Sequence, residues 1–285
     1  MIKEMRKYNR EPVDIIMPVF NQSECTRLAV ETIGQAGYPF RLIVVDNGST
    51  GKDKAALTKF AKAGNIDVLI RNKSNAGFSA AVNQGVEASR SKYFVITNND
   101  VVYTHWWLWK LVRALDGDES IAVSSPLRLQ KEPPGTSLLE ICAYQYEDLK
   151  KFPRWETDEK KGMEDLLMQV DAYVWILEKY FADNPEINPV TVNHGMVPFF
   201  CVAVRREHFE KLGRMDKDFG VGLCEDKYFC DLVKRGGLKL AVSRDCFVYH
   251  FMSQTLIKMF GSWEAIKDRI RENSHLAEVK LGISK

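Results

Sequence analysis

The stretch Val44-Val45-Asp46-Asn47-Gly48-Ser49-Thr50 ends a short apolar run with an acid and a turn. Two more apolar runs end in polar residues: residues 14–20 are followed by Asn21, and residues 93–97 by Asn98-Asn99-Asp100. Two further apolar runs, at residues 66–70 and 121–124, predict two more strands. Helix-like segments separate the strands, and helices are expected at 23–35, 52–63, 78–89 and 106–115. This alternation is typical of βαβ units and predicts an α/β fold with a Rossmann-like, mostly parallel sheet flanked by helices.

Polar residues at the ends of three strands indicate where a ligand would bind. In an open parallel sheet, ligands bind beyond the carboxyl ends of the strands. Asn21, Asp46 and Asp100 therefore predict a pocket for a polar ligand with hydroxyls, an imide edge or a metal ion. The alternative for any single strand end is an ordinary polar loop, and three in series weaken that alternative.

The composition is that of a globular protein. The chain has 285 residues, of which 45% are hydrophobic and 27% charged, and this excludes disordered and collagen-like classes. Lys+Arg 40 against Asp+Glu 38 leaves a formal charge of +2, which gives no global argument for a polyanionic partner. No apolar run approaches the ~20 residues that span a bilayer. The six cysteines match no zinc template, so we expect reduced thiols and a cytoplasmic protein, with peripheral attachment to a membrane as an alternative.

The regular alternation stops in the middle of the chain. Residues 130–190 read as a largely helical insertion with a long helix at 163–180, and α/β signals return with a strand at 199–204. The end of the chain, residues 262–280, reads as an amphipathic helix with Trp263, Ile266, Ile270 and Leu276 near one face. We expect one compact domain of two halves, residues 1–125 and residues 126–285.

The sequence lacks the motifs that are typical of several enzyme classes. No G-x-G-x-x-G follows the first strand, which disfavours a dinucleotide oxidoreductase. There is no P-loop motif and no G-x-S-x-G nucleophile elbow, so P-loop NTPases and elbow hydrolases are disfavoured as well.

Four segments, in order, form a recognisable set: Pro18-Val19-Phe20-Asn21, residues 44–50, residues 75–85 beginning Asn75-Ala76-Gly77, and Asn98-Asn99-Asp100. Together they resemble the nucleotide-sugar half of family 2 glycosyltransferases of the GT-A fold, and rhamnosyltransferase-like members most. Residues 199–206 and 213–219, Glu225-Asp226 and His250 resemble the acceptor-side half. The resemblance spans roughly residues 13–253 and implies transfer of a sugar from a nucleoside-diphosphate donor, with UDP- and dTDP-sugars favoured, to a hydroxyl acceptor such as a glycan or glycolipid.

The resemblance also implies roles for residues of the donor side. Asp46 would accept the imide N–H of a uracil or thymine ring, and an Asx-turn through Gly48 is the alternative. Arg71 would contact the base or a phosphate, and the alternative is a solvated arginine on the surface. The remaining donor-side residues would shape the nucleoside pocket or lie beside the donor sugar: Pro18, Phe20, Asn21, Asn75, Gly77, Asn98 and Asn99.

Asn98-Asn99-Asp100 stands where the family carries D-x-D. Asp100 would be the main anionic ligand of a Mn²⁺ or Mg²⁺ ion that screens the leaving diphosphate. The two asparagines depart from the family pattern and remove one carboxylate from that site. His250 would reach the same ion or the diphosphate, and a structural histidine is the alternative.

Glu225 and Asp226 open a predicted helix at 225–234. By resemblance Asp226 is the general base that takes the acceptor's hydroxyl proton in an inverting transfer, and Glu225 orients the base or the acceptor. The alternative is that both acids only suit the positive end of the helix dipole.

Competing functions remain at this point. A sugar nucleotidyltransferase would want a glycine-rich loop with an arginine after the first strand, which Pro18-Val19-Phe20-Asn21 does not provide. A non-catalytic sugar-binding relative is favoured only by Asn98-Asn99. A nucleic-acid or protein acceptor is a further alternative, and basic residues such as Lys150, Lys151 and Arg154 are compatible with a nucleic-acid acceptor.

Overall fold

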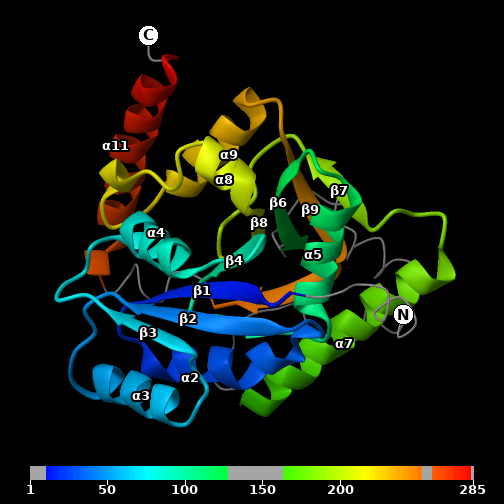
Figure 1. Ribbon diagram of the computed structural model, residues 1–285, viewed down its shortest axis with the longest axis horizontal. Helices are drawn as coiled ribbons and strands as arrows, with labels where there is room; N and C mark the ends of the chain where they lie inside the picture. Colours follow the sequence, from blue (N-terminus) through cyan, green and yellow to red (C-terminus); the bar gives the residue numbers. More distant parts are fainter. Residues whose placement is uncertain (1–10, 128–162, 252–258, 284–285) are drawn as a thin grey trace.

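The computed structural model of the protein describes residues 11–127, 163–251 and 259–283 (Figure 1). Lys150, Lys151, Arg154 and the first part of the expected insertion therefore lie outside the described residues. The strands are β1 (Val13–Val19), β2 (Phe40–Asp46), β3 (Val68–Arg71), β4 (Tyr93–Thr97), β5 (Val101–Tyr103), β6 (Ile121–Leu127), β7 (Val190–Asn193), β8 (Cys201–Arg205) and β9 (Lys239–His250).

The helices of the described residues follow the expected periodicity closely. They are α2 (Ser23–Thr32), η1 (Ile33–Ala36), α3 (Gly51–Lys62), α4 (Phe78–Ala88), α5 (Trp107–Gly117), α7 (Met163–Asp183), α8 (Arg206–Lys211), η3 (Lys217–Phe219), α9 (Glu225–Arg235) and α11 (Trp263–Leu281). Among these residues, none of the helices combines the length and the apolar character needed to cross a bilayer.

The described strands form one sheet in the order β3-β2-β1-β4-β8-β6-β9-β5, with β7 paired to β9. The first four in this order are parallel, as expected. The strand at 121–124 is present as β6, but it does not continue the parallel series next to β4. Instead β8 pairs antiparallel with both β4 and β6, so the sheet is mixed beyond β4.

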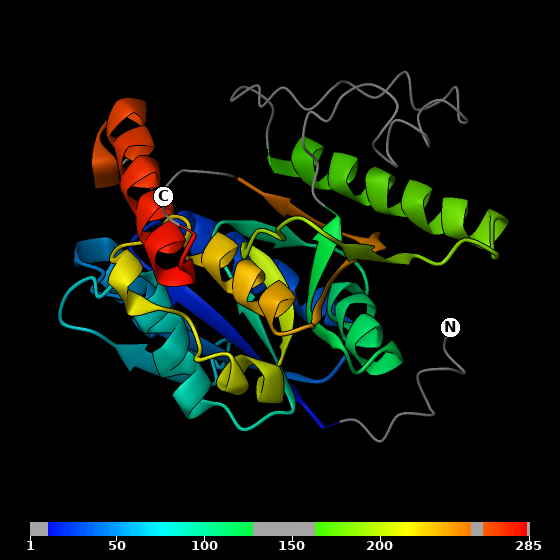
Figure 2. The ribbon, with the colours of Figure 1, turned by 90° about the horizontal axis from the view of Figure 1, so that it is seen from above.

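Helices cover both faces of the sheet (Figure 1, Figure 2). One apolar core packs α2, α3 and α5 against the sheet, through buried residues such as Ala29, Leu57 and Leu111. The core on the other face contains Val82 of α4, Phe209 of α8 and Phe229 of α9. The sheet is thus closed on both sides, and the carboxyl ends of its parallel strands provide the place where a ligand can enter.

The helix α7 packs on β9 through a smaller core with Leu177 and Phe247. An ion pair between Glu178 of α7 and the buried Lys110 of α5, 2.9 Å apart, joins the two helices. Trp175 of α7 is exposed. The helix in the described part of the expected insertion is therefore docked on β9, in the mixed part of the sheet.

The C-terminal helix α11 stands beside α9 (Figure 1, Figure 2). Its N-cap is Ser262, whose side chain accepts a hydrogen bond from Ala265 N–H. The buried residues of α11 are Ile266, Asn273, Ala277 and Leu281, whereas Trp263 and Ile270 are exposed. The expected apolar face was therefore wrong in part, because a buried asparagine lies at the centre of the face that packs.

Candidate functional site

A cavity of about 300 Å³ lies beyond the carboxyl ends of β1 and β4. Residues at the ends of these strands and residues at the start of α9 both belong to its lining. Its lining includes Pro18, Val19, Phe20, Asn47, Asn75, Phe78, Asn98, Asn99, Asp100, Phe199, Phe200, Leu223, Cys224, Glu225, Asp226, His250 and Met259. The parallel strand ends and a segment more than 100 residues later thus share one cavity, as the sequence predicted.

Nine of the thirteen predicted site residues line this cavity: Pro18, Phe20, Asn75, Asn98, Asn99, Asp100, Glu225, Asp226 and His250. Asn21, Asp46, Arg71 and Gly77 are not part of its lining among the described residues. Each of these four instead contacts neighbouring backbone or side chains.

Asp46 is almost completely buried, and its carboxylate already has two partners. Oδ1 accepts the backbone N–H of Ser49 at 2.8 Å, and Oδ2 lies 3.3 Å from Nη1 of Arg71. The Asx-turn considered as an alternative is therefore present. Asn21 braces the same turn, because its Oδ1 accepts the N–H of Thr50 and its N–H donates to Ser49 Oγ.

Gly77 adopts a φ of +89° that only glycine tolerates easily. A Cβ atom on Gly77 would lie 1.9 Å from the carbonyl oxygen of Gly220. The expected close approach of backbone is real, but the neighbour is the loop before α9. The loop at residues 75–77 and the loop at residues 219–224 are therefore packed backbone to backbone.

A network of side-chain amides holds the loop at residues 75–77. Asn47 donates from Nδ2 to Asn75 Oδ1 at 2.8 Å and to the Gly77 carbonyl at 3.2 Å. Its Oδ1 accepts from the N–H of Ala76 and from Asn72 Nδ2. Since these groups are neutral, the geometry of this loop does not depend on protonation.

Asp100 and His250 meet at the cavity from distant parts of the chain. Nε2 of His250 is 3.1 Å from Asp100 Oδ1 and 3.3 Å from Asn98 Nδ2. The imidazole stacks on Phe200, with ring centroids 4.9 Å apart and an angle of 6° between the planes. Strands β5 and β9 pair Val101 with His250, so backbone hydrogen bonding sets the separation of the acid and the imidazole.

Asp100 and His250 are side chains of types that can bind a metal ion. Within residues 11–127, 163–251 and 259–283, no group of three or more His, Cys, Asp or Glu side chains could hold a metal ion. A carboxylate together with an imidazole fits a Mn²⁺ or Mg²⁺ ion whose other ligands come from phosphate oxygens and water. The donor set therefore suits an ion that arrives with a substrate diphosphate.

Glu225 is the first residue of α9 and is 8% exposed. Desolvation, and then the charge of neighbouring Asp226, raise the pKa of Glu225 to about 8. Its Oε2 has no hydrogen-bond partner among the described residues. Glu225 is thus protonated at neutral pH and holds an unused polar atom in a cavity wall.

Asp226 lies next to Glu225 and lines the same cavity. Its Oδ1 accepts the N–H of Lys227 at 2.7 Å. Leu223 and Cys224, directly before the pair, have φ values of +75° and +70°, a region that non-glycine residues seldom adopt. This strained turn directs the start of α9 toward the cavity.

Sequence reasoning missed several residues of the lining. Asn47 was quoted in the 44–50 stretch, yet its role in holding Asn75 and Gly77 depends on contacts about 30 residues away. The stacking of Phe200, directly before β8, on His250 at the end of β9 joins residues 50 positions apart in the chain. The apolar residues beside each polar strand end could have indicated the rest of the cavity lining.

Comparison with known proteins identifies the family of this chain. Residues 14–213 match the family model described as Glycosyl transferase family 2. The curated glycosyltransferase AglE of Haloferax volcanii is 28% identical over 109 residues, which cover 37% of this chain and 36% of AglE. The matched stretch thus spans about a third of that relative's length.

Solved structures with the same fold include a mannosyltransferase from Pyrobaculum calidifontis in complex with GDP-Man and Mn²⁺, with a TM-score of 0.50 and 16% identity over 84% of this chain and 61% of that one. A second is GalNAc-T7 with UDP, GalNAc and Mn²⁺, with a TM-score of 0.56 and 16% identity over 84% of this chain and 43% of that one. At this identity the likeness is one of fold alone, and it confirms the expected GT-A fold.

Proposed function

The chain belongs to glycosyl transferase family 2, and from that premise we propose that it transfers a sugar from a nucleoside-diphosphate donor to a hydroxyl acceptor with inversion. The observation that carries the proposal is that Asn98 to Asp100 line the same cavity as Glu225 and Asp226. Residues 1–125 would bind the donor, and residues 126–285 would form the acceptor side, for which a glycan or glycolipid is the favoured substrate.

The donor nucleoside would lie at the ends of β1 and β2. Pro18 and Phe20 form the wall of the cavity there. A carboxylate has about four lone-pair sites, so Asp46 retains acceptor capacity beyond its bonds to Ser49 and Arg71. This supports its role toward the imide of a uracil or thymine ring, with Arg71 beside it.

The chemical step would be a single displacement at the anomeric carbon. The acceptor oxygen forms a bond to that carbon while the bond from the carbon to the diphosphate oxygen breaks, and the diphosphate leaves with the electron pair. Asp226 takes the acceptor's hydroxyl proton. Because Glu225 is protonated at neutral pH, it is Asp226 that serves as the base, while Glu225 donates a hydrogen bond to the substrate.

Asp100 and His250 would hold a divalent ion, Mn²⁺ or Mg²⁺. When bound, such an ion neutralises the negative charge that develops on a leaving diphosphate. The contribution of the chain is to keep Asp100 Oδ1 and His250 Nε2 close together before the substrate arrives.

A thermal-shift panel with UDP-, dTDP- and GDP-sugars, each with Mn²⁺ or EDTA, tests the proposal. A matching donor at about 100 Kd adds about 2.7 kcal/mol of stability, and we expect a rise in Tm with a UDP- or dTDP-sugar. Release of free sugar from that donor without an acceptor, measured by chromatography, separates an enzyme from a sugar-binding relative. No shift with any of the donors would contradict the proposal.

A further inference from the structure

The loop at residues 219–224 sits between two elements of the fold. On one side the Gly220 carbonyl abuts Gly77. On the other side lies α11, the helix that stands beside α9 (Figure 1). Residues 221–224 of the loop line the cavity, and Glu225 and Asp226 follow them directly. The position of both acids therefore depends on what fixes this loop.

Backbone carbonyls of the loop converge on one side chain of α11. Nδ2 of Asn273 donates to the carbonyl oxygens of Phe219, Gly222 and Leu223, at 3.2, 3.0 and 2.8 Å. Asn273 is 2% exposed. Two amide hydrogens are thus shared among three carbonyls that the irregular backbone leaves without helix or strand partners.

Weaker contacts from α11 reach the same loop. Arg269 donates from Nη2 to the Phe219 carbonyl at 3.2 Å, and the thiol of Cys224 lies 3.5 Å from Ser274 Oγ. Lys280 pairs with Asp216 and Asp218 just before the loop. Of these side chains, Asn273 alone is classed as buried, and it bonds carbonyls at both the start and the end of the segment from Phe219 to Leu223.

A strained backbone persists only where its surroundings over-determine it. Leu223 and Cys224 are such residues, and Asn273 binds the carbonyl of the first of them. We propose that Asn273 is a positioning residue, which fixes the loop at residues 219–224 and thereby holds Asp226 and Glu225 in the cavity. The inference rests on the function proposed above.

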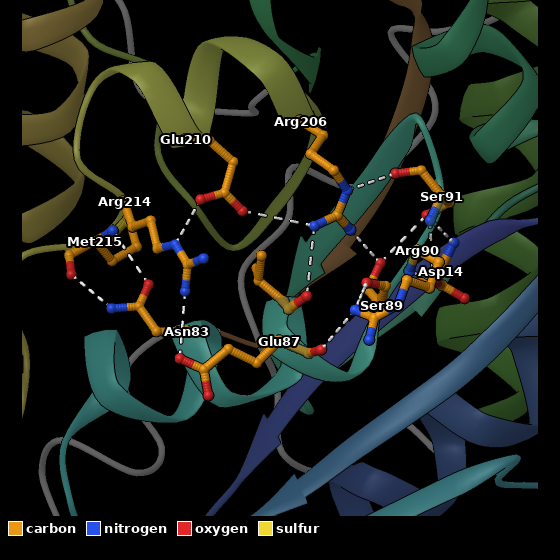
Figure 3. A network of polar contacts seen from close by, with 11 residues as sticks. Asp14, Asn83, Glu87, Ser89, Arg90, Ser91, Arg206, Glu210, Arg214 and Met215 are labelled. Atoms are coloured by element: carbon orange, nitrogen blue, oxygen red, sulfur yellow. Dashed lines mark hydrogen bonds and ion pairs between the residues drawn. The ribbon is translucent and has the colours of Figure 1, made fainter.

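The test compares Asn273→Leu with a matched control, Asn83→Leu. Asn83 of α4 is 6% exposed and exchanges two hydrogen bonds with the backbone of Met215 (Figure 3). Both variants remove a buried amide of similar size and leave backbone groups unpaired, but Asn83 does not bond the loop that precedes α9. Arg269→Met, which loses one bond to the loop and an exposed pair with Glu272 on the same helix, is the milder variant should Asn273→Leu fold poorly.

Hydrogen exchange followed by mass spectrometry on the ligand-free chain is the first measurement. We expect Asn273→Leu to raise exchange at least tenfold in peptides covering residues 219–226, Arg269→Met to raise it less, and Asn83→Leu to raise it around residues 213–217. Unchanged exchange at residues 219–226 in Asn273→Leu would overturn the proposal. This measurement requires no substrate, so it decides on Asn273 even if the wild-type chain transfers no sugar.

Steady-state kinetics with the donor chosen by the thermal-shift panel are the second measurement. A misplacement of about 1 Å can cost on the order of 100-fold in rate, and we expect such a loss in kcat for Asn273→Leu. The Kd values for UDP, dTDP and GDP, used as probes, should stay within threefold of wild type. Equal losses of kcat in Asn273→Leu and Asn83→Leu, at equal Tm, would show a merely structural role and overturn the proposal.

Discussion

The loop at residues 75–77 and the loop at residues 219–224 touch through Gly77 and Gly220, yet they are stabilised differently. Side-chain amide bonds from Asn47, about 30 residues earlier in the chain, hold the first. A helix about 50 residues further along the chain holds the second. The second also contains left-handed residues and precedes a buried carboxyl oxygen that has no hydrogen-bond partner in the described part of the chain.

Under the proposed function, the difference separates a donor-side platform from the loop that positions the two acids. A neutral, fully bonded network makes a rigid platform whose shape does not change with pH. An orphaned buried polar atom next to a strained turn has a cost that a bound substrate can offset. We therefore expect substitutions in the first loop to change binding and stability, and substitutions after the second to change turnover.

Asp226→Asn should give the largest effect on turnover. Removing a general base typically costs roughly 10²–10⁴-fold, while the amide keeps the size of the side chain. We expect kcat to fall by that factor and the Kd for the donor nucleotide to stay the same, as measured by steady-state kinetics and calorimetry. Near-normal turnover would remove Asp226 from the role of base.

Gly77→Ala should damage both loops at once. The new Cβ would overlap the Gly220 carbonyl, and φ +89° is strained for alanine. We expect about 1–3 kcal/mol from the backbone strain alone, more from the overlap, and a fall in turnover. Gly64→Ala is the control, because Gly64 has a similar φ of +78° but a Cβ atom there would have no neighbour within 4 Å. Equal destabilisation of the two variants in urea titrations would contradict the close packing of the loops.

Asn47→Ala should weaken the platform without removing catalytic groups. Unpaired buried partners cost about 1–3 kcal/mol, and we expect a weaker donor affinity with a smaller change in kcat. Asn184→Ala, which removes a single bond to the Tyr180 carbonyl on α7, is the control. The idea would fail if Asn47→Ala bound the donor nucleotide as tightly as wild type in calorimetric titrations.

Glu225→Gln should change turnover least and stability in a pH-dependent way. The pKa of Glu225 is raised from 4.5 to about 8, so between these values the folded chain keeps a proton that the unfolded chain has lost. Stability from this group is complete below pH 4.5 and declines as pH rises toward 8. Glutamine removes that decline, so the Tm of the variant should exceed that of wild type by a few degrees at pH 8.

At pH 4.5 the Glu225→Gln variant and wild type should melt together. Glu186→Gln, at an exposed site, should show no difference at either pH. A wild-type Tm that follows the variant across the whole range would mean that Glu225 ionises normally.

The parallel strands and their polar ends could be predicted because their pattern is local. β1, β2, β3 and β4 and the helices between them follow the expected segments within a few residues. β5 and most of β9 were missed. β5 has three residues, too few to show a period, and only residues 247–249 of β9 were identified as strand. The insertion of β8 between β4 and β6 depends on long-range pairing that no local pattern reports.

The site was predictable where chemistry and strand ends coincide. Asp100, Asp226 and His250 share the cavity as expected, whereas the surroundings of Asp46 and Gly77 are set by contacts with Arg71 and Gly220. Asn273 gave no signal, because an asparagine in a helical pattern reads as solvent-facing. Its role follows from three carbonyls about 50 residues earlier in the chain.

The β5–β9 ladder also has a consequence for the order of folding. The β1–β2 and β2–β3 pairs join strands that follow each other in sequence, whereas the Asp100–His250 contact closes a span of 150 residues. Forming so distant a contact carries a larger entropic cost and is slow. In pulse-labelling refolding experiments, amides of β1 and β2 should gain protection before those of β5. A nascent polypeptide would accordingly complete its first strands well before Asp100 and His250 could meet.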